Sequence, residues 1–326
     1  MRWVLALAVL LHAAVGAQAW ARGTVETSRF ESPSLGVAKN FRIYLPDGYA
    51  ASTARYPVIY LIHGWGVTER ACTDVDGLGE SADEMNLQAI VVMPDGDRGM
   101  YVNGHTPAAY ETCLADKAPT KNRRETREEY CVRTPLYEDY IVKDLIAHID
   151  ATYRSMARRE GRAITGESMD GFGATMLAFR HPDLFASVAA HSGIVVPLYP
   201  VPQPYVRGQT KPISQQELSE SPYLTEQRQI LGPDLATWRE HSPDVLAERL
   251  KNGQIAIYLD CGTEDQFGFL NQALYFHDRL NDLGIAHDFQ TAPGEHDDKL
   301  FRQRIKVSLR FHADQFRKLG TYTAKP

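Results

Sequence analysis

The 326-residue sequence has no excess of basic residues and no metal-binding motif. Lys and Arg number 35 against 41 Asp and Glu, so the formal net charge is −6 at pH 7. Nucleic-acid binding needs clustered Lys and Arg, and the short basic run at 121–127 is interleaved with glutamates, so we expect no nucleic-acid partner. The spacings C-x-x-C and H-E-x-x-H are absent, which argues against a metal site. We expect no metal and no organic cofactor.

Long apolar runs are also lacking, except at the N-terminus. There, Arg2 precedes the apolar residues 3–11, and Ala17-Gln18-Ala19 forms a site that signal peptidase can cut. The run is too short for a bilayer, which takes about 20 residues. We therefore predict a signal peptide at 1–19 and one mature domain at 20–326. The mature protein should be periplasmic or secreted, without membrane insertion after signal cleavage.

Cysteines are scarce, and export changes how the four of them are interpreted. In an oxidising compartment Cys113 and Cys131 could close a disulfide across a polar insertion. Cys72 and Cys261 could pair instead, or remain as buried thiols. Four cysteines allow three pairings, and the sequence does not choose among them.

Apolar residues follow strand and helix periods in alternation along most of the chain. Strands are predicted at 41–45, 58–62, 89–93, 163–165, 187–190, 255–259 and 287–291. Helices are predicted at 141–149, 170–180, 270–280 and 299–318. Such alternation predicts an α/β fold with a mostly parallel central sheet that is flanked by helices on both faces.

Two insertions, at 98–135 and 196–250, interrupt this alternation. Both follow strands, so both should lie at the carboxyl edge of the sheet, where α/β proteins bind ligands. They are either surface loops or the walls of a pocket. In the second insertion, Tyr199, Tyr205 and Trp238 are candidate substrate-binding residues.

The clearest chemical signal is the segment 164–173, Ile-Thr-Gly-Glu-Ser-Met-Asp-Gly-Phe-Gly. A predicted strand ends at Thr165 and a helix begins after Ser168. A turn of this kind exposes a serine at the top of the sheet as a nucleophile. Asp170 stands where the G-x-S-x-G motif has its second glycine, so the match depends on Gly171. The alternative is a glycine-rich turn in which the serine caps the helix.

A serine nucleophile needs a base and an acid that orients the base, and both have candidates after later strands. Asp265 follows the strand at 255–259, with Asp260 and Glu264 as alternative acids. His296 follows the strand at 287–291, and His191, at another strand end, is the rival base. Serine, acid and histidine in this order are typical of α/β-hydrolases.

A site for the oxyanion is predicted where the buried strand 58–62 runs into His63-Gly64-Trp65-Gly66. In this geometry the backbone N–H groups of Trp65 and of Met169, the residue after the serine, point at the developing oxyanion. Losing one such donor typically costs roughly 10²- to 10³-fold in rate.

These motifs together resemble the esterase D-type branch of the α/β-hydrolases. The branch includes S-formylglutathione hydrolases, feruloyl, acetylxylan and enterochelin esterases, and mycolyltransferases. The resemblance rests on Tyr56-Pro57-Val58 through His63-Gly64, Val92-Met93-Pro94-Asp95, Tyr137-Glu138-Asp139-Tyr140, Gly166-Glu167-Ser168-Met169, Leu259-Asp260-Cys261-Gly262-Thr263-Glu264-Asp265 and Pro293-Gly294-Glu295-His296. It implies a triad of Ser168, Asp265 and His296 with Trp65 and Met169 as oxyanion donors. The family usually has glycine where this chain has Asp170 and Glu295.

The resulting hypothesis is an exported serine esterase that acts through an acyl-enzyme. Its substrate would be a small-molecule or carbohydrate ester, such as a hydroxycinnamoyl or acetyl ester. One alternative is an acyltransferase of the same family, which uses the same acyl-enzyme. Another is a non-catalytic carbohydrate-binding protein, since a charged Asp170 that points into the site would oppose the oxyanion.

Overall fold

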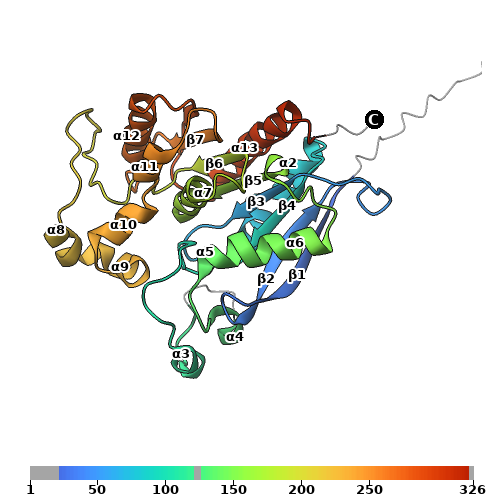
Figure 1. Cartoon of the computed structure of the whole chain (residues 1–326), viewed down its shortest axis with the longest axis horizontal. Helices are drawn as coiled ribbons and strands as arrows, with labels where there is room; N and C mark the ends of the chain where they lie inside the picture. Colours follow the sequence, from blue (N-terminus) through green and yellow to red (C-terminus); the bar gives the residue numbers. More distant parts are fainter. Residues whose placement is uncertain (1–21, 121–125, 323–326) are drawn as a thin grey trace, which may run out of the picture.

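Eight strands form one sheet in a computed structural model that describes residues 22–120 and 126–322 (Figure 1). The strand order is β1-β2-β4-β3-β5-β6-β7-β8. The strands are β1 (Thr24–Ser32), β2 (Val37–Leu45), β3 (Val58–Ile62), β4 (Ile90–Pro94), β5 (Arg162–Glu167), β6 (Ser187–His191), β7 (Ala256–Gly262) and β8 (Asp288–Ala292). From β4 to β8 all neighbours are parallel, whereas β1–β2 and β2–β4 are antiparallel. The predicted mostly parallel sheet is confirmed.

Each predicted strand is present, and β1 is an addition. Its sequence, Thr24–Ser32, is exposed over most of its length, so it lacks the apolar run that marks a buried strand. It forms because it pairs with β2 along the whole of both strands, from Thr24 opposite Leu45 to Ser32 opposite Val37. Edge strands depend on such pairing more than on their own burial.

Alternate residues of the central strands enter two separate cores. On β3, Val58, Tyr60 and Ile62 belong to the larger core, while Ile59 and Leu61 belong to the other. The larger core packs against helices on one face, and the smaller one against α2 and α13 on the opposite face. A strand buried on both sides reads as a continuous apolar run, which is why 58–62 could be identified from the sequence.

The helices outside the insertions cover these two faces. They are α1 (Ala71–Asp74), α2 (Leu78–Glu84), α5 (Tyr137–Asp139), the π-helix η1 (Tyr140–Leu145), α6 (Ile146–Thr152), the short η2 (Arg159–Gly161), α7 (Met169–Arg180), α12 (Phe269–Asp282) and α13 (Asp298–Lys318). The helix predicted at 141–149 is thus a π-helical turn that continues as α6. The helices α6, α7 and α12 supply buried residues to the larger core.

The two insertions form short helices at one side of the molecule (Figure 1). The first insertion holds α3 (Tyr110–Ala115) and α4 (Arg127–Tyr130). The second holds α8 (Gln215–Glu220), η3 (Pro222–Leu224), α9 (Thr225–Leu231), α10 (Leu235–His241), α11 (Pro243–Leu246) and η4 (Ala247–Arg249). A backbone hydrogen bond of 2.7 Å from His105 N to Ile230 O joins the two insertions.

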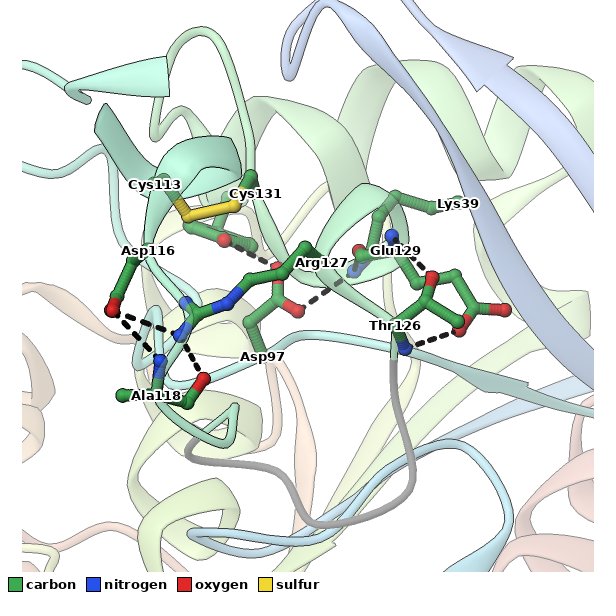
Figure 2. The surroundings of a disulfide bond; sticks show 10 residues. Lys39, Asp97, Cys113, Asp116, Ala118, Thr126, Arg127, Glu129 and Cys131 are labelled. Atoms are coloured by element: carbon green, nitrogen blue, oxygen red, sulfur yellow. Dashed lines mark hydrogen bonds and ion pairs between the residues drawn. A yellow bond between two sulfur atoms is a disulfide. The ribbon is translucent and has the colours of Figure 1, made fainter. Parts of the chain in front are cut away.

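A disulfide between Cys113 and Cys131 closes the first insertion (Figure 2). Of the pairings that the sequence allowed, this one is present, and Cys72 and Cys261 are buried free thiols. The buried Lys39 of β2 donates to the backbone oxygen of Glu129 at 2.7 Å, which holds the insertion against the sheet.

The predicted signal peptide at 1–19 lies outside the described residues. Over residues 22–120 and 126–322, no helix is both long and apolar enough to cross a bilayer. The same residues contain no cluster of three or more His, Cys, Asp or Glu side chains arranged to hold a metal ion.

Candidate active site

Ser168 lies in the sharp turn between β5 and α7. Its backbone has φ 58° and ψ −121°, a left-handed conformation that costs a non-glycine residue about 1–3 kcal/mol. Backbone hydrogen bonds hold the turn in place, from Ser168 N to His191 O at 2.9 Å and from Gly171 N to Ser168 O at 3.1 Å. The turn therefore presents the serine side chain at the carboxyl end of β5, as the sequence predicts.

Glycine is required at two points where this turn approaches other backbone. A Cβ on Gly166 would lie 2.2 Å from Asp170 O, and a Cβ on Gly171 would lie 2.6 Å from Gly193 Cα. Real Cβ atoms do not come this close to backbone. Gly171, rather than residue 170, is thus the position at which α7 and the loop after β6 come so close that glycine is required.

Ser168, His296 and Asp265 form one continuous chain of hydrogen bonds. Nε2 of His296 lies 2.8 Å from Ser168 Oγ, and Nδ1 lies 2.8 Å from Asp265 Oδ2. The other carboxylate oxygen, Oδ1, accepts from the N–H groups of Phe267 at 3.0 Å and Phe269 at 3.2 Å. This arrangement can move a proton from the serine hydroxyl to the imidazole while the carboxylate stabilises the charged ring.

The carboxylate of Asp265 is held in its ionised form. Burial of its side chain on its own would raise the pKa of Asp265, but hydrogen bonds from His296 and from two backbone N–H groups lower that pKa overall. Cys261 lies behind it, with Sγ 3.7 Å from Oδ2. Burial raises the pKa of the Cys261 thiol, so this group remains protonated and can donate its S–H to the carboxylate.

Aromatic rings surround His296 on several sides. Phe267, Phe269 and Phe301 each meet the imidazole edge to face, with ring centroids 5.1–5.2 Å apart. Gln266 also fixes the backbone of this loop, since its Oε1 accepts from His296 N at 2.9 Å. The base is therefore held by packing as well as by its hydrogen bonds.

The turn at 63–66 lies directly over the serine. A Cβ on Gly64 would come 3.7 Å from Ser168 Cβ, so the two backbones are neighbours. Within the described part of the chain, the backbone N–H groups of Trp65 and Met169 donate to no other protein group. Both residues line the same cavity as Ser168. They therefore stay the candidates for the two oxyanion donors.

The side chain of His63 holds this turn in place by hydrogen bonds. The buried ring bonds through Nδ1 to Gly64 O at 3.0 Å and accepts from Gly96 N at Nε2 at 2.9 Å. Asp95 Oδ1 lies 3.3 Å from the same Nε2. Because both ring nitrogens are engaged, the imidazole cannot rotate without breaking the turn that carries Trp65.

Asp170, which departs from the family pattern, points away from the reaction site. It is fully buried, it does not line the cavity, and neither carboxyl oxygen has a hydrogen-bond partner among the described residues. Burial raises the pKa of Asp170 to about 8, and the neighbouring His63 opposes only part of this rise. The group is thus mainly protonated and neutral at pH 7, so it does not oppose an oxyanion at Ser168.

The alternative acid Asp260 and the rival base His191 are engaged with each other, and the other alternative acid, Glu264, is exposed. His191 Nδ1 bonds to both carboxylate oxygens of Asp260, at 2.9 and 3.0 Å, and Arg304 Nε donates to Asp260 at 2.7 Å. His191 and Asp260 are buried, and neither these two nor Glu264 belongs to the described residues that line the cavity at Ser168. This network joins β6, β7 and α13 and has a structural role.

The cavity at Ser168 has a volume of about 540 Å³. Its walls are largely apolar and aromatic. The lining residues are Trp65, Met100, Ser168, Met169, Ile194, Pro222, Tyr223, Thr225, Glu226, Gln227, Phe267, Phe269 and His296. Tyr223 is 89% exposed and Phe267 is 60% exposed, so two large aromatic side chains at this cavity are largely open to solvent.

The three predicted substrate-binding residues are absent from this lining, and the structure corrects that prediction. Trp238 is buried and donates from Nε1 to Gly232 O at 2.8 Å. Tyr199 packs on Tyr275, and Tyr205 donates from its hydroxyl to Asp278 at 2.8 Å. They pack the second insertion against α12. The aromatic wall comes from Tyr223 of the same insertion and from Phe267 and Phe269. These two phenylalanines closely follow Asp265 in the sequence, so their position could have indicated them.

The chain is similar to known proteins over most of its length. The model of the Esterase family, described as "Putative esterase", matches residues 32–312. Esterase Rv1288 of Mycobacterium tuberculosis is 28% identical over 279 residues, which cover 82% of this chain and 54% of that protein. S-formylglutathione hydrolase of Rattus norvegicus is 26% identical over 254 residues, covering 75% of this chain and 76% of that one. The chain thus spans about half the length of the first of these relatives.

Among solved structures, the fluorophosphonate-binding serine hydrolase F of Staphylococcus aureus has the same fold. The TM-score is 0.67 at 20% identity, over 89% of this chain and 98% of that one. The predicted α/β-hydrolase fold is confirmed.

Proposed function

The chain belongs to the Esterase family, and from this premise we propose that it is a serine hydrolase that cleaves carboxylic esters through an acyl-enzyme. One observation carries the proposal. The hydroxyl of Ser168, the ring of His296 and the carboxylate of Asp265 are joined by hydrogen bonds of 2.8 Å, at the wall of an open cavity. A protein without a catalytic role has no need for this chain of contacts.

The reaction begins when Ser168 Oγ attacks the ester carbonyl and its proton moves to His296 Nε2. The negative charge that develops on the carbonyl oxygen is stabilised by the N–H groups of Trp65 and Met169. As the intermediate collapses, His296 returns the proton to the departing alcohol, and an acyl group remains on Ser168. Asp265 stays ionised throughout, since the hydrogen bonds that lower its pKa persist when the ring is charged.

A water molecule then takes the place of the alcohol. His296 removes its proton, the water oxygen attacks the acyl carbon, and the carboxylic acid leaves while Ser168 regains its proton. With a second alcohol in place of water, the same steps would transfer the acyl group. Product analysis in the presence of a sugar acceptor distinguishes the two, because pure hydrolysis yields only the free acid.

The cavity supports an ester with a flat or short acyl group. Tyr223 and Phe267 are exposed aromatic side chains that line it, and stacking between aromatic rings adds about 0.5–1.5 kcal/mol to burial. We therefore favour hydroxycinnamoyl or acetyl esters of carbohydrates as substrates. Release of ferulate from a feruloylated sugar supports this choice, whereas activity confined to simple acetates would refute the aromatic part of it.

Export to the periplasm or medium remains part of the proposal. It rests on the sequence of residues 1–19, and the disulfide between Cys113 and Cys131 is compatible with an oxidising compartment.

Hydrolysis of p-nitrophenyl esters of increasing chain length tests the proposal. Wild-type protein should cleave the short esters, and Ser168→Ala should lose at least roughly 10⁴-fold in kcat, since the serine and histidine of a triad act as a unit. Tyr205→Phe, which removes a hydroxyl away from the cavity, should behave as wild type. Equal activity of wild type and Ser168→Ala would refute the assignment of the nucleophile.

A further inference from the structure

A second cavity of about 250 Å³ adjoins the cavity at Ser168. The two cavities share two lining residues, Trp65 and Glu226, so they meet at the turn that carries a proposed oxyanion donor. At about 30 Å³ for each water, the second cavity could hold about eight waters, or one ring-sized group. A substrate that reacts at Ser168 could thus extend past Trp65 into it.

The wall of the second cavity is built mainly from the first insertion. Tyr130, Val132 and the disulfide of Cys113 and Cys131 line it. This segment is fixed at several points (Figure 2): Arg127 donates to Asp116 at 2.9 Å, and Lys39 of the sheet holds the backbone of Glu129. The cavity therefore has a constrained wall, which binding sites require.

Arg98 lies at the boundary between the two cavities. Its guanidinium stacks over the ring of Trp65, 4.8 Å from the centroid, and Nη1 lies 3.6 Å from Glu226 Oε2. Its Nε is buried and has no hydrogen-bond partner among the described residues. Since Arg98 and Glu226 both line the second cavity, a guanidinium and a carboxylate lie side by side in its wall.

The charges around the cavity favour a neutral ligand. Lys39 donates to Asp97 at 2.8 Å (Figure 2). The hydroxyl of Tyr137 also donates to Asp97, and burial raises the pKa of Asp97 to about 6. An anion would face the carboxylates of Asp97 and Glu226, and a cation would face Arg98. An apolar group would remove water from the guanidinium of Arg98 and the carboxylate of Glu226 without replacing the hydrogen bonds of that water, which costs about 1–3 kcal/mol for each group. A neutral group rich in hydroxyls can replace those hydrogen bonds.

We propose that the second cavity binds the sugar alcohol of the ester, with Arg98 and Glu226 bonded to its hydroxyl groups. This inference rests on the proposed function, because it assigns the alcohol side of the same reaction. The acyl group occupies the aromatic cavity at Ser168, and the sugar lies across Trp65 in the second cavity. Arg98 is then a specificity residue for the leaving group.

Two esters with the same acyl group and different alcohols test the assignment. We compare kcat/KM for feruloylated arabinose and for methyl ferulate in wild type and in Arg98→Met, which keeps a side chain against Trp65 but removes the donors. The ratio of the sugar ester to the methyl ester should fall roughly 10-fold, the effect of one lost hydrogen bond. Arg133→Met is the matched control, since Arg133 belongs to the same insertion, stacks on Tyr110 and lines neither cavity. Its ratio should equal that of wild type.

A binding measurement separates this inference from the proposed chemistry. Saturation-transfer NMR with methyl arabinofuranoside and the Ser168→Ala protein should detect binding, which Ala109→Trp should abolish by filling the cavity. If both esters are cleaved and the ratio is the same in wild type and Arg98→Met, the inference is wrong and the hydrolase stands. If Ala109→Trp abolishes sugar binding but wild type cleaves neither these esters nor p-nitrophenyl acetate, the cavity assignment is supported and the proposed hydrolase is refuted.

Discussion

Asp170 should make the stability of the protein depend on pH in a way that one substitution removes. The carboxyl group is fully buried without a hydrogen-bond partner among the described residues, and burial raises its pKa from 3.8 to about 8. Between these two values the folded protein holds a proton that the unfolded chain releases. Stability is therefore greatest at low pH, falls as the pH rises from about 4 to about 8, and does not change further above that.

The size of the effect follows from the same numbers. Each pH unit between the two pKa values costs about 1.4 kcal/mol of unfolding free energy, so the contribution of Asp170 falls by about 2.5 kcal/mol from pH 5 to pH 7. Asp170→Asn has no such proton to lose. Groups away from this site titrate equally in both proteins, so the difference between wild type and Asp170→Asn reports on Asp170 together with its effect on His63 and Glu167, whose pKa values it raises.

Urea unfolding at pH 5 and pH 7 measures the difference. Relative to wild type, Asp170→Asn should gain about 2.5 kcal/mol of unfolding free energy between the two pH values, with an unchanged m-value. Asp183→Asn, at an exposed position, is the control and should follow wild type. The reasoning fails if Asp170→Asn and wild type change by the same amount. It also fails if Asp170→Asn raises kcat at pH 7 many-fold, because a charged Asp170 would then oppose the oxyanion.

Three further predictions concern the site and the insertion. Asp265→Asn should lower kcat on p-nitrophenyl acetate by roughly 10³- to 10⁴-fold at pH 7, because the amide cannot hold His296 in the required tautomer. An unchanged kcat would show that another group orients the ring. Tyr223→Ala should raise KM for methyl ferulate roughly 3- to 10-fold, because stacking on the aromatic acyl group is lost, and should change KM for p-nitrophenyl acetate little. Equal changes in KM for the two esters would exclude stacking as the cause. Cys113→Ser should lower the unfolding free energy by roughly 3 kcal/mol, since the disulfide closes a loop with a sequence separation of 18. Reduction of the wild-type disulfide should lower the unfolding free energy by the same amount. No loss in either experiment would show that the insertion is held by its other contacts.

The sheet and the hydrogen-bonded chain at Ser168 could be predicted because their signals are local. A strand such as 58–62 is buried on both faces, so its residues alone identify it. Parallel strands end at a common edge, which brings the loops of Ser168, Asp265 and His296 together whatever the details of packing.

The aromatic cavity and the state of Asp170 depend on contacts that the sequence does not encode locally. In the second insertion, Tyr199 packs on Tyr275, whereas Tyr223 is exposed at the cavity. The pKa of Asp170 follows from complete burial against β5 and the loop after β6, which only the folded chain defines. The second cavity likewise requires two insertions that lie side by side.

Labelling by a fluorophosphonate tests the central claim most directly. Ser168 Oγ should displace fluoride and form a bond to phosphorus, and intact-mass and peptide spectrometry should find one adduct per chain, on Ser168. His296→Ala should slow the labelling many-fold, because the 2.8 Å hydrogen bond that activates the hydroxyl is lost, and Ser168→Ala should abolish it. An adduct on another serine, or equal labelling of wild type and His296→Ala, would contradict the claim that Ser168 is a nucleophile activated by His296.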